Sequence, residues 1–140
     1  MVSAMSLTSA KAGPVAPDRE TRRAIEQVIA LYHEGIHLGD IDRLERVFHP
    51  EARLFGQVAG ASYLKTRAEY LDVVRGRVPP AAAGYPSGGE LLSLDVRGAV
   101  ALAVVLTPVN DVEYVDFLSL VRTADGWRVA SKLFTDEVAG

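Results

Sequence analysis

Residues 114–134 read YVDFLSLVRTADGWRVASKLF, and this stretch decides the fold. Apolar residues recur with period two on both sides of the turn at 124–126, which predicts an antiparallel hairpin of strands 112–122 and 127–135. The first of these strands is apolar on both faces, with Val115, Phe117 and Val121 on one and Tyr114, Leu118 and Leu120 on the other. Both faces of the sheet therefore need to be covered.

The preceding sequence predicts helices followed by an antiparallel meander. Helical spacing covers residues 19–38, a short segment that ends with Phe48, and a segment after Thr66, with Asp18, Asp40 and Thr66 as N-caps. Further strands are predicted at 52–58, 62–64, 91–96 and 100–106. We expect an α+β fold in which the helices lie over one face of a strongly curved, mostly antiparallel sheet.

Length and composition restrict the class of protein. A chain of 140 residues, 49% of them hydrophobic, can bury a sizeable core, which excludes disorder for most of it. The net charge of −3 argues against nucleic-acid binding, and no apolar run approaches the roughly 20 residues of a membrane span. The absence of cysteine excludes disulfides and thiolate metal sites. We expect a disordered tail at 1–17 without a secretory signal, one domain at 18–140, and a cytoplasmic location.

Two stretches resemble the nuclear transport factor 2-like superfamily, and within it the lumazine-binding branch. They are YHEGIHLGDIDRLERVFHPEARLFG at 32–56 and the stretch at 114–134. The matching features are the helical Gly35, the Gly39-Asp40 break, Phe48-His49-Pro50 and the closing D-x-L-S-L, G-W and K-x-F elements. The resemblance spans about residues 20–136.

The resemblance implies a cone, with helices against a bent sheet and a pocket at the open end. Similar proteins include ketosteroid isomerase, SnoaL-type polyketide cyclases and non-catalytic interaction modules, so the fold does not select a function. We carry no lumazine or flavin ligand over from this resemblance and expect no cofactor.

Asp116 and Lys132 are the main candidates for chemistry. A carboxylate within an apolar strand is costly unless it is paired or hydrogen-bonded. If the final hairpin has a three-residue loop, both side chains project from the same face of neighbouring strands, whereas a loop one residue shorter or longer separates them. Two interpretations stay open: a pocket acid or base that Lys132 tunes, and a structural ion pair, which the available lysine favours.

Asp116→Asn separates these interpretations. Removing one member of a buried ion pair costs about 3–5 kcal/mol of stability. Neutralising a functional carboxylate costs little stability but abolishes binding or turnover.

The histidines are weaker candidates. His49 is a candidate general acid or base, or alternatively a cap at the end of the second helix. His33 and His37 have the four-residue spacing of metal ligands. Neither a third ligand nor an H-E-x-x-H pattern accompanies them, so we expect no metal site and retain His33 only as a candidate ligand contact.

Aromatic residues are the candidates for lining a pocket. Those expected toward the interior are Tyr32, Tyr70, Tyr114, Phe55 and Phe134. Most would supply buried area, and one or two tyrosines would keep a hydroxyl for a ligand. The segment at 79–89, PPAAAGYPSGG, is predicted to be a mobile flap whose Tyr85 closes over the opening.

Two functions from different classes follow. The first is a cofactor-free enzyme or binding protein for a small apolar or aromatic carbonyl compound, with Asp116 as the acid or base of an isomerisation, dehydration or cyclisation. Tyr32 or Tyr114 would then donate to the developing oxyanion. The second is a non-catalytic ligand-binding or dimeric interaction module. The uncovered apolar face of the sheet predicts a homodimer in either case.

Overall fold

The computed structural model describes residues 16–137, so most of the predicted tail at 1–17 lies outside the described residues. The elements are, in chain order, α1 (Arg19–Leu38), α2 (Ile41–Val47), β1 (Phe48–Val58), β2 (Ala61–Thr66), α3 (Arg67–Arg75), β3 (Glu90–Arg97), β4 (Val100–Val109), β5 (Val112–Thr123) and β6 (Gly126–Thr135). The strands form one sheet in the order β2-β1-β6-β5-β4-β3. Only the β1–β6 pair is parallel, so the predicted α+β fold with a mostly antiparallel sheet is confirmed.

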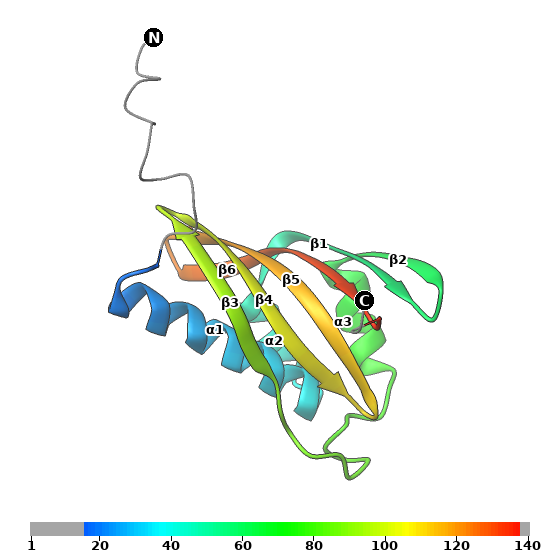
Figure 1. Cartoon of the computed structure of the whole chain (residues 1–140). Coiled ribbons are helices and arrows are strands. Elements are labelled where there is room, and N and C mark those ends of the chain that lie inside the picture. Colours follow the sequence, from blue (N-terminus) through cyan, green and yellow to red (C-terminus); the bar gives the residue numbers. More distant parts are fainter. Residues whose placement is uncertain (1–15, 138–140) are drawn as a thin grey trace.

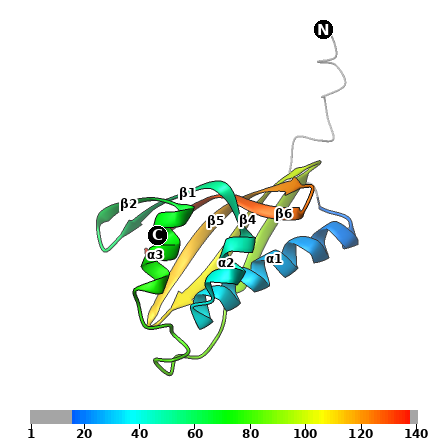
Figure 2. The ribbon, with the colours of Figure 1, turned by 180° about the vertical axis from the view of Figure 1, so that it is seen from behind.

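The helices lie over one face of this open sheet. Figure 1 shows the sheet from the side that no helix covers. Figure 2 shows the molecule turned by 180°, with the helices in front of the sheet. We call the helix-covered face the inner face and the bare one the outer face. Within residues 16–137, no helix is both long and apolar enough to cross a membrane.

The predicted helix caps are confirmed. Asp18 and Asp40 each accept a hydrogen bond from the backbone N–H three residues later, and Thr66 forms a reciprocal capping box with Glu69. Gly39 ends α1 in the left-handed conformation, with φ of 65°. These local signals make α1 and α2 two separate helices, so that the apolar stripe of α1 can pack on the sheet. The buried residues of that stripe are Ile25, Ile29, Tyr32 and Ile36.

One predicted helix boundary is wrong. Phe48 belongs to strand β1 rather than to the second helix, with φ −91° and ψ 135°. The residue before a proline avoids helical backbone, and here the extended conformation begins one residue before His49. Strand β1 is consequently longer than predicted, and its first residue is buried in the core.

The final hairpin contains a feature that the sequence analysis did not anticipate. Thr123 pairs with Gly126, so the loop has two residues, not three. Farther along the hairpin, Leu120 pairs with Val129 but Ser119 pairs with Ser131, so Ala130 forms a β-bulge. Because of this extra residue, the pairs beyond the bulge are the same as those that a three-residue loop would give.

Because of the bulge, Asp116 and Lys132 share the inner face. Asp116 pairs with Phe134, and Lys132 pairs with Leu118, two residues along β5. Both charged side chains are therefore buried beneath the helices.

Candidate functional site

A small cavity lies between the inner face of the sheet and the helices. Its volume is about 120 Å³. Its walls come from α1, from α3 and the residues after it, and from strands β1, β2, β4, β5 and β6. The lining residues are Ile36, Val58, Tyr63, Tyr70, Val73, Arg77, Thr107, Val109, Tyr114, Asp116, Lys132 and Phe134. We call this the inner cavity.

Asp116 has two differently placed carboxylate oxygens. Its Oδ2 accepts hydrogen bonds from the hydroxyl of Tyr32 and from Thr107 Oγ1, the latter at 2.7 Å. Its Oδ1 is buried and has no hydrogen-bond partner among the described residues. Leaving a buried acceptor without a donor costs free energy. Oδ1 is therefore the atom of Asp116 at which a hydrogen-bond donor of a ligand would bind most favourably.

The hydrogen bonds of Asp116 extend to His33. Thr107 Oγ1 lies 3.1 Å from His33 Nε2. Since the single hydroxyl proton of Thr107 is donated to Asp116, Thr107 must accept from Nε2–H of the imidazole. Burial lowers the pKa of His33 below its usual 6.5, which favours this neutral form. The network therefore runs from His33 through Thr107 to Asp116 and Tyr32.

Lys132 is the second charged group at the cavity. Its side chain is buried, and Nζ lies 4.6 Å from the ring centroid of Phe134, 5.1 Å from that of Tyr70 and 5.2 Å from that of Tyr32. Within residues 16–137, no carboxylate oxygen lies within 4.0 Å of Nζ. Asp116 and Lys132 thus face one cavity without forming the direct ion pair that the sequence analysis favoured.

The protonation of Lys132 reflects opposing influences. Burial lowers the pKa of the ammonium group below its ordinary 10.5, and the positive charge of Arg77 lowers it further. The carboxylate of Asp116 acts in the opposite direction but does not reverse the shift. The amine therefore loses its proton more readily than the amine of an exposed lysine.

The phenols at the site stay neutral near pH 7. Burial raises the pKa of Tyr70 and of Tyr63 to about 12. Burial and the adjacent Asp116 raise the pKa of Tyr32 well above 10. Tyr114, on β5, also has a raised pKa because of burial. These groups can donate hydrogen bonds but do not act as anions.

The structure brings together most of the predicted site residues. Asp116, Lys132, Tyr70, Tyr114 and Phe134 line the inner cavity. Tyr32 and His33 lie behind this wall, in the hydrogen-bond network. The hydroxyl of Tyr32 is already donated to Asp116, so the expectation that it donates to a ligand oxyanion does not fit this geometry.

Three predicted residues, Phe55, His49 and Tyr85, belong neither to the wall of the inner cavity nor to the hydrogen-bond network of Asp116. Phe55 was expected inside but is 44% exposed on the outer face, because the alternation of β1 places Leu54 inward. His49 lies at the start of β1, where Nδ1 accepts a hydrogen bond from the backbone of Glu51 at 3.0 Å. Tyr85 lies in the 79–89 loop and is 37% exposed.

The 79–89 loop has its own hydrogen bonds. Ala81 N–H donates to the carbonyl of His37 at the end of α1, and Tyr85 N–H donates to the carbonyl of Pro80, both at 3.0 Å. At its other end, Gly89, at φ of 135°, lies so close to His33 that a Cβ at this position would be 2.3 Å from Nδ1 of the imidazole ring. The loop therefore supports the network of Asp116 from outside, and its predicted mobility stays a prediction.

Three polar lining residues were not predicted from the sequence: Thr107, Tyr63 and Arg77. Thr107 carried a signal, because it follows Ala101, Ala103 and Val105 on the same buried face of β4 and is the polar residue in that series. Arg77 carried none, since it follows α3 in a segment with no periodic pattern.

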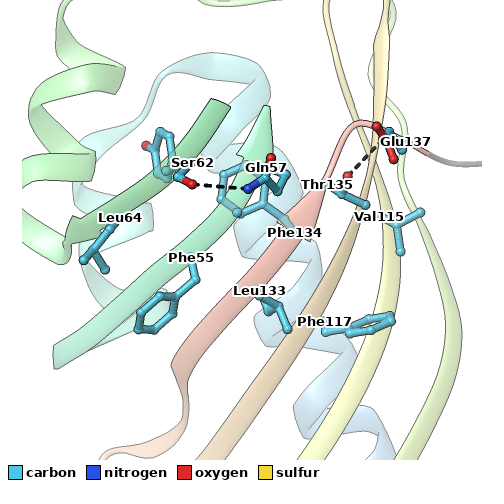
Figure 3. A pocket seen from close by; sticks show the side chains of 12 residues that line it. Phe55, Gln57, Ser62, Leu64, Val115, Phe117, Leu133, Phe134, Thr135 and Glu137 are labelled. Atoms are coloured by element: carbon cyan, nitrogen blue, oxygen red, sulfur yellow. Dashed lines mark hydrogen bonds between the residues drawn. The ribbon is translucent and has the colours of Figure 1, made fainter. Parts of the chain in front are cut away.

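A larger apolar groove lies on the outer face. Its volume is about 580 Å³, and Figure 3 shows Phe55, Leu133 and Phe117 side by side on β1, β6 and β5. Direct cross-strand pairing extends this row in both directions. The paired residues are, in order across five strands, Leu64, Phe55, Leu133, Phe117 and Val104.

Within residues 16–137, no group of three His, Cys, Asp or Glu side chains could hold a metal ion. The site is therefore defined by a buried carboxylate, a buried amine and neutral phenols around a small cavity. A mostly antiparallel open sheet with helices over one face is the fold that the resemblance to nuclear transport factor 2-like proteins implied.

Comparison with known proteins agrees with this class. The chain belongs to the family described as "Putative lumazine-binding", whose model matches residues 20–135. Among curated proteins, none matches the sequence.

Solved structures of the class are similar in fold. An NTF2-like protein of unknown function from Shewanella baltica has a TM-score of 0.75 at 21% identity, over 86% of this chain and 96% of that one. An NTF2-like protein with a cystatin-like fold from Novosphingobium aromaticivorans has a TM-score of 0.62 at 22% identity, over 86% and 84%. A ketosteroid isomerase-like protein from Erwinia carotovora atroseptica has 0.64 at 14% identity, over 89% and 100%. At these identities the likeness concerns the fold alone.

The family description mentions lumazine, a bicyclic compound. The inner cavity of about 120 Å³ is smaller than the roughly 300–1,000 Å³ of pockets for drug-sized ligands. It does not accommodate a bicyclic ring as it stands, so we derive no chemistry from such a ligand.

Proposed function

We propose that this protein binds a small carbonyl compound in the inner cavity and catalyses proton transfer at the carbon next to the carbonyl, without a cofactor. The observation that carries the proposal is the asymmetry of Asp116. One oxygen is held by Tyr32 and Thr107, whereas the other is buried without a donor. A carboxylate held in this way has one oxygen committed to orientation and one available to receive a proton.

The remaining groups supply the other half of the chemistry. As Asp116 Oδ1 takes the proton, the electrons of the C–H bond move to the carbonyl oxygen and an enolate forms. The ammonium of Lys132 and the hydroxyls of Tyr70 and Tyr114 line the same cavity and can stabilise that oxygen. Returning the proton to another carbon gives an isomer. If the enolate carries a β-hydroxyl group, cleavage of that C–O bond, with the proton on Asp116 passing to the departing oxygen, releases water and gives a dehydration.

The size of the cavity limits the substrate. A volume of about 120 Å³ lies well below the roughly 300–1,000 Å³ of pockets for drug-sized ligands. The reacting part of the ligand is therefore a few non-hydrogen atoms, smaller than the aromatic ligands that the sequence analysis also allowed.

Hydrogen–deuterium exchange of small ketones tests the proposal. Acetone and cyclopentanone are incubated with the protein in D₂O, and loss of the α-proton signal is followed by NMR. We expect faster exchange than in buffer, abolished by Asp116→Asn and retained by Asp125→Asn, a change in the β5–β6 turn. Exchange at the buffer rate, or equal exchange with Asp116→Asn, would overturn the proposal.

Asp116→Asn is a well-matched variant, because an asparagine oxygen can still accept from Tyr32 and Thr107. Its stability should therefore change little, which separates loss of chemistry from loss of fold. Binding of the ketones without exchange would instead support the alternative of a non-catalytic ligand-binding module.

We also propose that the protein is a homodimer that associates through the outer face. The supporting observation is the row of five apolar side chains that crosses this face, three of which (Leu64, Phe117 and Leu133) are 46–64% exposed. A continuous exposed apolar surface of this kind is characteristic of protein interfaces. A second copy would cover it without hindering the helices or the inner cavity.

A further inference from the structure

We infer that Lys132 is a reactive amine that forms an imine with a small aldehyde or ketone in the inner cavity. This inference deepens the proposed function, because it assigns the same site a covalent mode of binding. It does not depend on Asp116 acting as the base, so the two can fail separately.

The geometry sets Lys132 apart from Lys65, the other lysine within residues 16–137. Lys132 is 6% exposed and lines the cavity, whereas Lys65 lies on β2 in a partly exposed position, with Nζ 5.2 Å from the ring centroid of Tyr63. Both amines therefore face an aromatic ring, but only that of Lys132 is removed from water.

An imine requires the neutral amine, because the protonated one has no free electron pair. No carboxylate within residues 16–137 lies within 4.0 Å of Lys132 Nζ to hold its positive charge. Burial and the nearby Arg77 both favour the neutral form. At a given pH, a larger fraction of Lys132 than of an exposed lysine is therefore neutral, although the carboxylate of Asp116 partly opposes this shift.

The reaction is balanced without a co-reactant. The electron pair of Nζ attacks the carbonyl carbon, the C=O π electrons move to oxygen, and a proton passes from nitrogen to that oxygen to give a carbinolamine. The C–O bond then breaks, the oxygen leaves as water after taking up a proton, and a C=N bond forms. Tyr70 and Tyr114 line the cavity as neutral hydroxyls that can donate a hydrogen bond to the departing oxygen, while solvent supplies its proton and the nitrogen keeps its own in the protonated imine.

The surroundings of Nζ suit the product. A protonated imine is a cation on the same nitrogen, so the rings of Tyr32, Tyr70 and Phe134, at 4.6–5.2 Å, attract it as they attract an ammonium. Asp116 faces the same cavity, where its carboxylate is a counter-charge to the protonated imine. The carboxylate can also accept a proton from the carbon next to the C=N bond. The arrangement therefore retains a cationic adduct in a buried position.

Reductive trapping tests the inference. The full chain is incubated with dilute acetone or glycolaldehyde and sodium cyanoborohydride at pH 7, and the modified peptides are measured by mass spectrometry. We expect modification of Lys132 to exceed that of Lys65 by about tenfold or more within the same wild-type sample. Equal or slower modification of Lys132 would overturn the inference, and this comparison needs no variant to fold.

Variants distinguish this inference from the proposed function. Lys132→Arg should remove the rapid adduct and Lys65→Arg should leave it, with the fluorescence of Trp127 reporting that each variant is folded. Trapping at Lys132 of the wild-type protein, with ketone protons that exchange only at the buffer rate, would support the imine and overturn the proposed proton transfer. Exchange that survives without any Lys132 adduct would overturn the imine and leave the proposed proton transfer standing.

Discussion

The two faces of the sheet both depart from ordinary burial: the inner face buries charged and polar side chains, and the outer face exposes apolar ones. The inner face, covered by helices, buries Asp116, Thr107 and Lys132, which are the buried polar or charged residues of the described chain. The outer face, which no helix covers, exposes large apolar side chains, among them Phe117 and Leu133. Buried polar groups and exposed apolar surface are the two departures from ordinary burial that most often mark a function.

The same two strands supply both faces. Asp116 and Phe117 are consecutive on β5, and Lys132 and Leu133 are consecutive on β6. Because successive side chains point to opposite sides of a sheet, a shift of one residue would exchange the chemistry of the two faces. The bulge at Ala130 is therefore as important for the site as the charged residues themselves.

The largest effect is expected on the outer face. Phe117→Arg places a charge in the middle of the apolar row and should weaken dimerisation by more than about 100-fold, or roughly 3 kcal/mol. Sedimentation velocity at micromolar concentration measures it. Val78→Arg is the control, since Val78 is 66% exposed and lies outside the sheet. A wild-type protein that sediments only as a monomer would contradict the outer-face dimer.

On the inner face, Tyr32→Phe should have the next largest effect. It removes the hydroxyl that donates to Asp116 Oδ2 but keeps the ring beside Lys132. A hydrogen bond to a buried charged group contributes about 2 kcal/mol, so the free energy of unfolding in urea should fall by that amount. Tyr85→Phe, in the exposed loop, should change it little. Equal losses for the two variants would show that the contact with Asp116 does not stabilise the inner face.

Lys132→Met should have the smallest effect, and with the opposite sign. Methionine fills the same apolar space without a buried charge, so the variant should be more stable than wild type by about 1 kcal/mol at pH 7.

The advantage of Lys132→Met should depend on pH. The folded-state pKa of Lys132 is lowered below 10.5, the value of an exposed lysine. At pH values between the folded-state pKa and 10.5, the unfolded chain therefore binds more protons than the folded one. Wild-type stability therefore rises with pH through this window, and the advantage of the variant shrinks as pH approaches 10.5. Unfolding curves at pH 7 and pH 10 measure the change, with Lys65→Met as control. A difference that is the same at both pH values would contradict the buried ammonium.

Much of the fold was predictable because its signals are local. The caps at Asp18, Asp40 and Thr66 are confirmed, since each depends on a side chain and a backbone N–H three residues away. The strands of the meander were predicted from alternation, which requires no knowledge of their partners. Phe55 was misplaced because an aromatic residue was assumed to be internal, although the alternation of β1 through Leu54 pointed the other way.

The sequence by itself determined that burying the carboxylate of Asp116 in an apolar strand is unfavourable, and that Lys132 is the lysine available to balance its charge. Only the tertiary structure decided that the two face one cavity without pairing, because that depends on the Ala130 bulge and on the rings that surround Nζ. It also decided that Thr107 and Tyr32 hold one oxygen of Asp116 and leave the other free. Residue types and their periodicity can be read directly from the sequence. The position of one hydrogen-bond donor relative to another cannot, because it depends on how strands and helices that are distant in sequence pack together.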